Sequence, residues 1–427
     1  MERRHGRLSI GLLLAAGCMA QSPTQPRTLT WQEAQQEFRT NNPQLLAGQV
    51  TIDESRADEI TAYLRPNPDI SATIDQINPF TTQPPPNGGS PTYSPFAYAL
   101  PSGSISYLHE RRHKRELRLA SAQKATAIAI SAQSDLERTL TFNLRDAFVR
   151  VLQAKAVSRV AKDNLDYYDK EIAINRERFK AGGIAKVDFQ RVELQRVQYE
   201  SDLATAEVDL RTAKIDLIAL LRERTPVEQF DVTGTFDFSE TNVSLEDLRT
   251  TALNTRPDLK EAEQSLEKAR TDHQLSVANG STDPTFSVDV ARNPPIPAYV
   301  GFTVSIPLRI FDRNQGDKLH TLLDIGRNQK LLDQAQITAL HDVDSAYATL
   351  QSTVQLLRPY KQLYLSEAEQ IRETVSFAYQ HGAASLLDFL DAQKEYRDTE
   401  LNYVNLVGSY LSAANQVNFA VGREVIR

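Results

Sequence analysis

The chain has 427 residues, of which 41% are hydrophobic and 24% charged, and its formal net charge is −7. This acidic balance argues against a general nucleic-acid binder, because such proteins usually carry a surplus of Lys and Arg. A single cysteine excludes an intrachain disulfide and a cysteine-based metal cluster. After the N-terminal segment no run of about 18 apolar residues could form a transmembrane helix. A membrane role therefore needs β-strands or a lipid anchor.

The N-terminus has the layout of a secretory signal. Three arginines precede a short apolar run over residues 8–16, and Gly and the only cysteine, Cys18, follow. We predict a signal peptide at 1–17, which is excluded from reasoning about the fold. Cys18 follows small residues as in a bacterial lipobox, which makes it the candidate lipid anchor, although Ala15 stands where that motif usually has Leu. Ordinary cleavage near Ala20, which would remove Cys18, is the alternative.

The rest of the chain contains an internal duplication. Pro43 and its neighbours match those of Pro257 at an offset of 214 (257 − 43), and Asp188-Phe189 matches Asp388-Phe389 at an offset of 200 (388 − 188). A period this long, seen twice, indicates a duplication rather than a solenoid of short repeats. The offset between matching residues is 216 at Ser71 and 199 at Ile105, so the first copy holds about 17 extra residues (216 − 199) between these two positions. The extra residues form a Pro- and Gly-rich stretch with the composition of a loop.

We expect five parts in the chain. They are a signal peptide at 1–17, an N-terminal linker at 18–28, a first structural repeat at 29–225, an equatorial connecting segment at 226–242 and a second structural repeat at 243–427.

Each repeat contains one predicted β-hairpin, at about 69–108 and 284–308. Apolar residues alternate with polar ones in both, as in Ile70-Ser71-Ala72-Thr73-Ile74, and this period of two is typical of half-buried strands. The strands are long enough to cross a bilayer at a tilt. Four strands cannot close a barrel, and an open edge in lipid leaves backbone groups unpaired. If these strands span a membrane, the chain must form an oligomer.

The remaining sequence is predicted to be helical. No proline occurs between Pro101 and Pro226, and residues 113–179 are rich in strong helix formers. A helix of that length extends about 100 Å. The second copy is expected to run from 316 to 379, with Pro359 kinking or loosening it. Such long helices suggest coiled-coil packing against their neighbours.

Two segments carry a resemblance to a known family. Residues 379–393, with Gly382 and the run Ser-Leu-Leu-Asp-Phe-Leu-Asp-Ala-Gln, resemble the helical turn of the outer-membrane efflux (TolC-like) family. Residues 305–316, SIPLRIFDRNQG, and 65–69, RPNPD, resemble its cobalt–zinc–cadmium resistance branch. The resemblance covers residues 29–422.

The resemblance implies a mostly α-helical protein with a transmembrane β part. Three copies would close a twelve-stranded outer-membrane β-barrel that continues as a long α-helical barrel across the periplasm. The implied function is a passive exit duct, not an enzyme, with no cofactor. The implied partners are two further copies of the chain, outer-membrane lipid, a periplasmic adaptor (membrane fusion) protein and an inner-membrane pump, usually of the resistance–nodulation–division type.

His109-Glu110-Arg111-Arg112-His113 spells the zincin motif H-E-x-x-H. In a zincin the two histidines bind zinc and the glutamate activates water. Against this interpretation, two arginines occupy the intervening positions, where burial in a cleft would be costly. The alternative is a polar strand-to-helix junction whose cations, Lys114 and Arg115 among them, face lipid headgroups or solvent.

Asp188, Asp388 and Asp391 are the candidate functional residues. Each follows a glycine-containing turn on the returning helix, and in a trimer each would form a ring of three carboxylates. The resemblance implies that Asp388 and Asp391 line a closed periplasmic aperture. Mutual repulsion in such a ring should raise some of their pKa values and attract cations. The alternative is that they cap the helix or favour its dipole. Ala384 stands where some family members carry an arginine.

The leading hypothesis is therefore the exit duct of a tripartite efflux system for small solutes or metal cations. The outer-membrane duct of a type I protein secretion system has the same architecture and is the alternative within transport. A zinc metalloprotease built on His109, Glu110 and His113 is the alternative among enzymes. A periplasmic coiled coil is disfavoured, since four alternating strands have no place in it.

Overall fold

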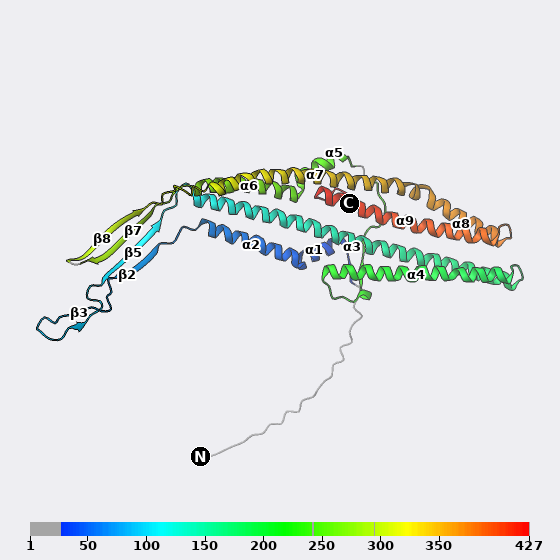
Figure 1. The fold of residues 1–427 in the computed structure, drawn as a ribbon. Helices are drawn as coiled ribbons and strands as arrows, with labels where there is room; N and C mark the ends of the chain where they lie inside the picture. The colour runs from blue at the N-terminus through cyan, green and yellow to red at the C-terminus, as the bar shows by residue number, and fades with distance from the viewer. Residues whose placement is uncertain (1–26, 241–242, 294, 427) are drawn as a thin grey trace, which may run out of the picture.

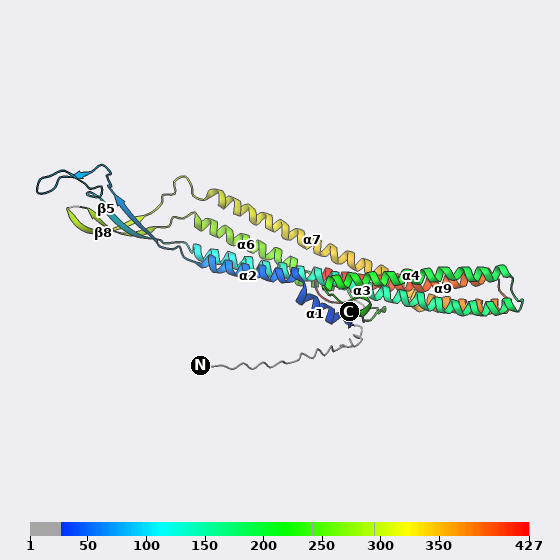
Figure 2. The same ribbon diagram turned by 90° about the horizontal axis from the view of Figure 1, so that it is seen from below.

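The computed structural model describes residues 27–240, 243–293 and 295–426. The molecule is long and narrow, with a β-sheet at one end and helical hairpins at the other (Figure 1). The view from below shows the long helices running side by side from the sheet to the far tips (Figure 2). The predicted signal peptide at 1–17 and the candidate lipid anchor Cys18 lie outside the described residues.

The two halves contain corresponding elements, except that α7 and α8 of the second half together correspond to the single helix α3 of the first. The first half has α1 (Trp31–Asn41), α2 (Pro43–Tyr63), β2 (Asp69–Asp75), β5 (Leu100–Leu108), α3 (Lys114–Lys180) and α4 (Lys186–Leu221). The second half has α5 (Leu245–Thr255), α6 (Pro257–Asn279), β7 (Thr285–Asn293), β8 (Ile296–Ser305), α7 (Gln315–Pro359), α8 (Leu365–Gln380) and α9 (Leu386–Val421). Within the described residues, no helix is long and apolar enough to cross a membrane.

The four long strands form one antiparallel sheet in the order β2-β5-β7-β8. The central β5–β7 pairing joins the two halves, with Ile105 opposite Val288 and Tyr107 opposite Phe286. Residues opposite one another share a face of the sheet, so apolar side chains collect on one face and Ser, Thr and Asp on the other. The outer edges, β2 and β8, have no further strand partner among the described residues.

The predicted loop of the first hairpin contains a small hairpin of its own. Strands β3 (Thr82–Gln83) and β4 (Thr92–Tyr93) pair within it, and Figure 1 shows this segment extending past the tip of β7 and β8. The corresponding turn between β7 and β8 is short. The extra residues of the first copy therefore lie beyond the sheet and leave the matched helices unchanged in length.

The long helix predicted in the first half forms as one continuous rod, whereas the rod predicted in the second half is interrupted. The first rod, expected at 113–179, is α3, but the rod expected at 316–379 consists of α7, a π-helical turn (Tyr360–Tyr364) and α8. Pro359 lacks a backbone N–H and cannot continue the regular ladder of i to i−4 bonds, so an extra residue is accommodated at this point. The loosening predicted at Pro359 is confirmed.

The segment that connects the two halves packs against the middle of the molecule. Strand β1 (Arg27–Leu29) pairs in parallel with β6 (Phe230–Val232), which follows a short 3₁₀ turn (Val227–Gln229). Buried side chains of β1, α1, α3, α4 and β6 form one apolar cluster there. A second cluster joins α5, α7 and α9, and a third lies near the helical tips. The core is thus a series of clusters along a rod.

Equivalent helix starts in the two halves use different chemistry. The Asn42 side chain accepts hydrogen bonds from the backbone N–H groups of Gln44 and Leu45 and so caps α2. The equivalent residue before α6 is Arg256, which is 4% exposed. Arg256 donates to Asp258 at 2.7 Å and to Asp342 at 3.0 Å, joining α6 to α7. Burial raises the pKa of Asp258, but the hydrogen bonds and charge of Arg256 outweigh it and lower that pKa overall.

We predict that Arg256→Met destabilises the middle of the molecule by about 3 kcal/mol, because Asp342 loses its ion pair and Asp258 keeps only the more distant Arg138. A carboxyl group with a depressed folded pKa stabilises the fold above its unfolded value of about 3.9, and that contribution disappears as the pH falls. Thermal unfolding of the wild type and the variant between pH 3 and 7 should show the largest loss of stability in the variant at neutral pH. An equal loss at all pH values would contradict this assignment.

Candidate functional site

The two helical hairpins end in equivalent turns at the tip distant from the sheet. Gly182 (φ 74°) and Gly382 (φ 77°) adopt left-handed conformations that other residues rarely occupy, and each reverses the chain direction. Behind each turn two aromatic rings stack, Phe179 on Phe189 at 5.3 Å and Tyr379 on Phe389 at 4.8 Å. These rings fix the start of α4 and α9, on which the predicted aspartates lie.

Asp388 is part of a helix cap in this structure. Its carboxylate accepts hydrogen bonds from the backbone N–H of Ser385 at 3.0 Å and from the Ser385 hydroxyl at 2.7 Å. The Ser385 oxygen in turn accepts from the Asp388 backbone N–H, which completes a reciprocal capping box. These bonds to Ser385 hold the pKa of Asp388 below its usual value. The capping interpretation therefore describes Asp388 within one protomer.

Asp391 and Asp188 differ from Asp388 in their surroundings. Asp391 is exposed one turn further along α9, on the same side as Asp388. Asp188 is half-buried at the start of α4. The residue equivalent to Ser385 is Ala185, which provides no side-chain cap. The three aspartates lie on equivalent helix starts at the same end of the molecule (Figure 1), and only Asp388 belongs to a capping box.

A polar contact between the two helical hairpins was not predicted from the sequence. Arg372 on α8 is buried between the rings of Tyr167 and Tyr396, at 4.1 and 3.7 Å from their centroids. Close by, the Gln380 amide donates to Glu171 of α3 at 3.2 Å. Burial raises the pKa of Glu171. Cation–π contacts of this kind hold α8 and α9 against α3. No local sequence motif indicates which residues make them.

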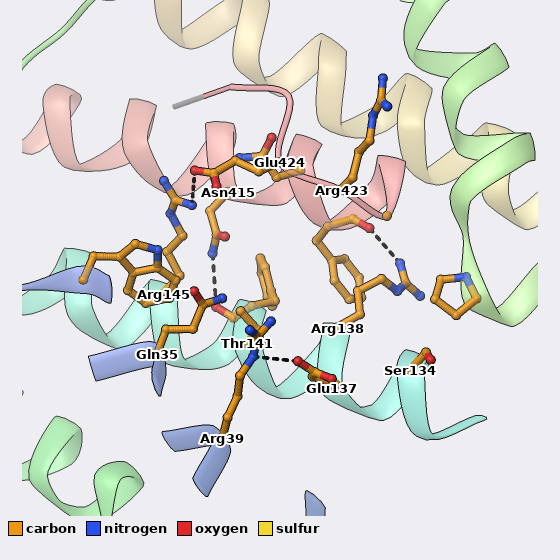
Figure 3. Close-up of a pocket in the computed structure, with 16 residues that line it drawn as sticks. Gln35, Arg39, Ser134, Glu137, Arg138, Thr141, Arg145, Asn415, Arg423 and Glu424 are labelled. Carbon is orange, nitrogen blue, oxygen red and sulfur yellow. Dashed lines mark hydrogen bonds and ion pairs between the residues drawn. The ribbon is translucent and has the colours of Figure 1, made fainter. Parts of the chain in front are cut away.

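A cavity lies at the equator of the molecule, and most of the charged side chains that line it are already paired. It has a volume of about 430 Å³ and lies between α1, α3 and the end of α9 (Figure 3). Arg39 pairs with Glu137 at 2.6 Å, and Arg145 pairs with Glu424 at 2.8 Å. Arg138 donates to the Phe419 carbonyl at 2.7 Å. The bonds of Arg138 and Arg145 join the C-terminal segment to the first half, and the Arg39 pair joins α1 to α3.

The zincin motif does not assemble a metal site. Glu110 makes a bidentate ion pair with Arg118, at 2.5 and 2.9 Å, and the His113 side chain is 87% exposed. Across residues 27–240, 243–293 and 295–426, no three His, Cys, Asp or Glu side chains are grouped to hold a metal. The motif belongs to the strand-to-helix junction.

The expectation that all cations of this junction face solvent or headgroups is wrong for Lys114, whereas Arg111 stays exposed although it also bonds to the protein. Lys114 is 4% exposed and donates to Asp283 at 2.5 Å and to the Ser281 carbonyl at 2.9 Å. Arg111 donates to the Thr282 carbonyl at 2.6 Å. Both side chains bind the segment between α6 and β7, so they fix the direction of the sheet relative to the helices.

Comparison with known proteins agrees with this architecture. Residues 248–423 match the family model described as "Outer membrane efflux protein". A cobalt-zinc-cadmium resistance protein, CzcC of Cupriavidus metallidurans, is 23% identical over 90% of this chain and 87% of its own. The outer membrane protein TolC of Vibrio cholerae is 24% identical over 91% of this chain and 90% of its own. The resemblance to outer membrane efflux proteins drawn from the sequence is thus confirmed, over residues 248–423 by the family model and over most of the chain by these relatives.

Solved structures show the same fold. A crystal structure of CusC superposes with a TM-score of 0.74 at 17% identity, covering 92% of each chain. The open state of the MtrE outer membrane channel of Neisseria gonorrhoeae gives 0.72 at 16% identity, covering 94% of this chain and 90% of that one. The TolC relative is an outer membrane protein, and the MtrE neighbour is an outer membrane channel.

Ser385→Ala should remove the cap of α9, and Ala185→Ser should create one on α4 with Asp188 at the third helical position. A capping interaction contributes about 1 kcal/mol. Hydrogen exchange at residues 386–389 should therefore become about fivefold faster in the first variant, and exchange at 186–189 should become slower in the second. Unchanged exchange in both variants would show that the caps do not set local stability at the tip.

Proposed function

We propose that three copies of this chain form a passive exit duct in the outer membrane, as part of a tripartite efflux system. The observation that carries the proposal is the four-stranded sheet with two free edges, β2 and β8. Backbone groups at such an edge cannot stay unpaired in lipid. Pairing β8 of one copy with β2 of the next satisfies both edges, and three copies give twelve strands.

The distribution of side chains supports a barrel with a polar interior. Along β7, Phe286, Val288 and Val290 lie on one face, whereas Ser287 and Asp289 lie on the other. The apolar face suits lipid and the polar face suits a water-filled lumen. The long helices then continue the wall away from the membrane. Members of this family are trimeric outer membrane channels that work with adaptor and pump components, and we extend this assembly to the present chain.

The cargo of the duct is proposed only as a broad class. The relatives' names include cobalt-zinc-cadmium resistance and pyoverdine export, so one architecture is associated with different solutes. Small solutes and metal cations are the proposed cargo. Cation passage fits the carboxylates proposed at the tip, where rings of Asp388 and Asp391 would surround the aperture and Asp188 would add a weaker ring.

The proposed trimer is tested by measuring the molar mass of the protein in detergent. Multi-angle light scattering of the detergent-solubilised protein should give a trimer, because the unpaired edges of one copy are satisfied only by its neighbours. Planar bilayers containing the protein should then show discrete channel conductance. A monodisperse, folded monomer would remove the basis of the proposal.

The proposed aperture is tested by cation block. Divalent or trivalent cations added at the periplasmic side should block the wild-type channel, and Asp388→Asn with Asp391→Asn should lose most of that block. Asp188→Asn should have a smaller effect. The block should also fade near 1 M salt, where the screening length is about 3 Å.

Ser385→Ala is the matched control for this experiment, because it removes the cap of α9 and keeps both carboxylates. This variant should keep the wild-type block. If the doubly neutralised channel is still blocked like the wild type, the aspartates act as caps and do not form the aperture.

A further inference from the structure

A small basic pocket lies at the junction where β5 passes into α3. It has a volume of about 300 Å³ and is lined by the Arg65-Pro66 pair, Tyr107 and residues 109, 110 and 112–116. The same residues contain the motif that binds no metal, and the proposed duct gives them no role. The pocket therefore needs an explanation of its own.

Positive charge exceeds negative charge around this pocket. Within and beside it lie six fixed cations (Arg65, Arg111, Arg112, Lys114, Arg115 and Arg118) and three carboxylates (Glu110, Glu116 and Asp283), a surplus of three. The whole chain has a net charge of −7, so this concentration runs against the overall balance. A local positive field of this kind favours an anionic ligand.

Two of the cations remain available for a ligand. Lys114 pairs with Asp283, Arg118 with Glu110, and Arg115 with Glu116. Arg65 and Arg112 line the pocket, are exposed, and form no ion pair or side-chain hydrogen bond within the part of the chain that the structure describes. Arg112 also has a left-handed backbone (φ 60°), which sets it apart from the helix that follows.

The pocket adjoins the apolar face of the sheet. Tyr107, which lines it, is opposite Phe286 and shares its face with Ile105 and Val288. His109 lies two residues further along, with its ring 6.5 Å from that of Phe286. A molecule with a charged head in the pocket could therefore lay its apolar part along these side chains. The strand involved, β5, is an inner strand, away from the edges that pair in the proposed trimer.

We propose that this pocket binds the phosphate group of an anionic phospholipid in the periplasmic leaflet, with Arg65 and Arg112 as its phosphate contacts. Guanidinium groups match phosphate oxygens with paired hydrogen bonds. Basic pockets near a membrane surface attract the headgroups of anionic lipids. The proposal rests on insertion of the sheet into the outer membrane, and it adds a specific lipid contact to the duct.

The test is native mass spectrometry of the full-length protein in a nonionic detergent, titrated with dioleoyl-phosphatidylglycerol. The wild type should retain this lipid in preference to phosphatidylcholine, whose headgroup has no net charge. Arg65→Gln with Arg112→Gln should weaken the retention of phosphatidylglycerol at least about tenfold, because each basic residue near a membrane surface adds to the binding of anionic lipid and two such residues are lost. Arg65→Lys with Arg112→Lys should give an intermediate value, because it keeps the charge and loses the planar fork.

Arg222→Gln with Arg224→Gln is the matched control. These exposed arginines lie in the equatorial region, and Arg222 has the same left-handed backbone as Arg112 (φ 57°). This control should retain lipid like the wild type. An equal loss in the control, or equal retention of the two lipids by the wild type, overturns the proposal without depending on whether the pocket variant assembles.

A competition arm separates the lipid from a free anion. Inorganic phosphate at millimolar concentration should leave phosphatidylglycerol bound. If it displaces the lipid, the pocket is a soluble-anion site and the lipid assignment is wrong. A wild-type trimer that conducts but retains no lipid overturns this proposal and leaves the duct intact, whereas failure to form a trimer overturns the duct itself.

Discussion

Unpaired backbone hydrogen-bonding groups at the two edges of one small sheet govern the rest of this structure. Each edge strand presents N–H and C=O groups that water can satisfy but hydrocarbon cannot. Four strands are too few to close on themselves, so the edges can be satisfied in a membrane only by other copies. The proposed trimer follows from this constraint, and the alternation of side chains along the strands agrees with it, since one face of the sheet is apolar and the other polar.

The helical part depends on a different balance. Its apolar clusters are small and separate, and the rods between them are held by paired charges and by rings stacked on cations. Arg256 at the equator and Arg372 near the tip are both buried, and both link helices far apart in sequence. Such contacts confer less stability than an apolar core of similar volume, but they fix the register of one rod against another.

Much of the fold could be predicted from the sequence because its signals are periodic. Alternation located three of the four strands clearly and β5, which contains Pro101 and Gly103, more weakly. Absence of proline located α3, and Pro359 marked the interruption of the second rod. Contacts between distant residues could not be predicted in this way. Nothing near Lys114 in the sequence indicates Asp283 as its partner, and nothing near Arg372 indicates two tyrosines on other helices. Asp388 shows the limit most clearly, since its place near a helix start already suggested a cap, which the structure shows, whereas the proposed ring would form only between copies.

The insertion between β2 and β5 has a consequence for symmetry. The internal duplication makes a trimer approximately six-fold around its axis, because each copy supplies two similar hairpins and two similar rods. Only one hairpin of each pair carries the long loop with β3 and β4. Long and short loops would then alternate around the outer rim, and the symmetry there would fall to three-fold. The external opening of the proposed duct would therefore have three-fold symmetry, whereas the wall below it would be nearly six-fold symmetric.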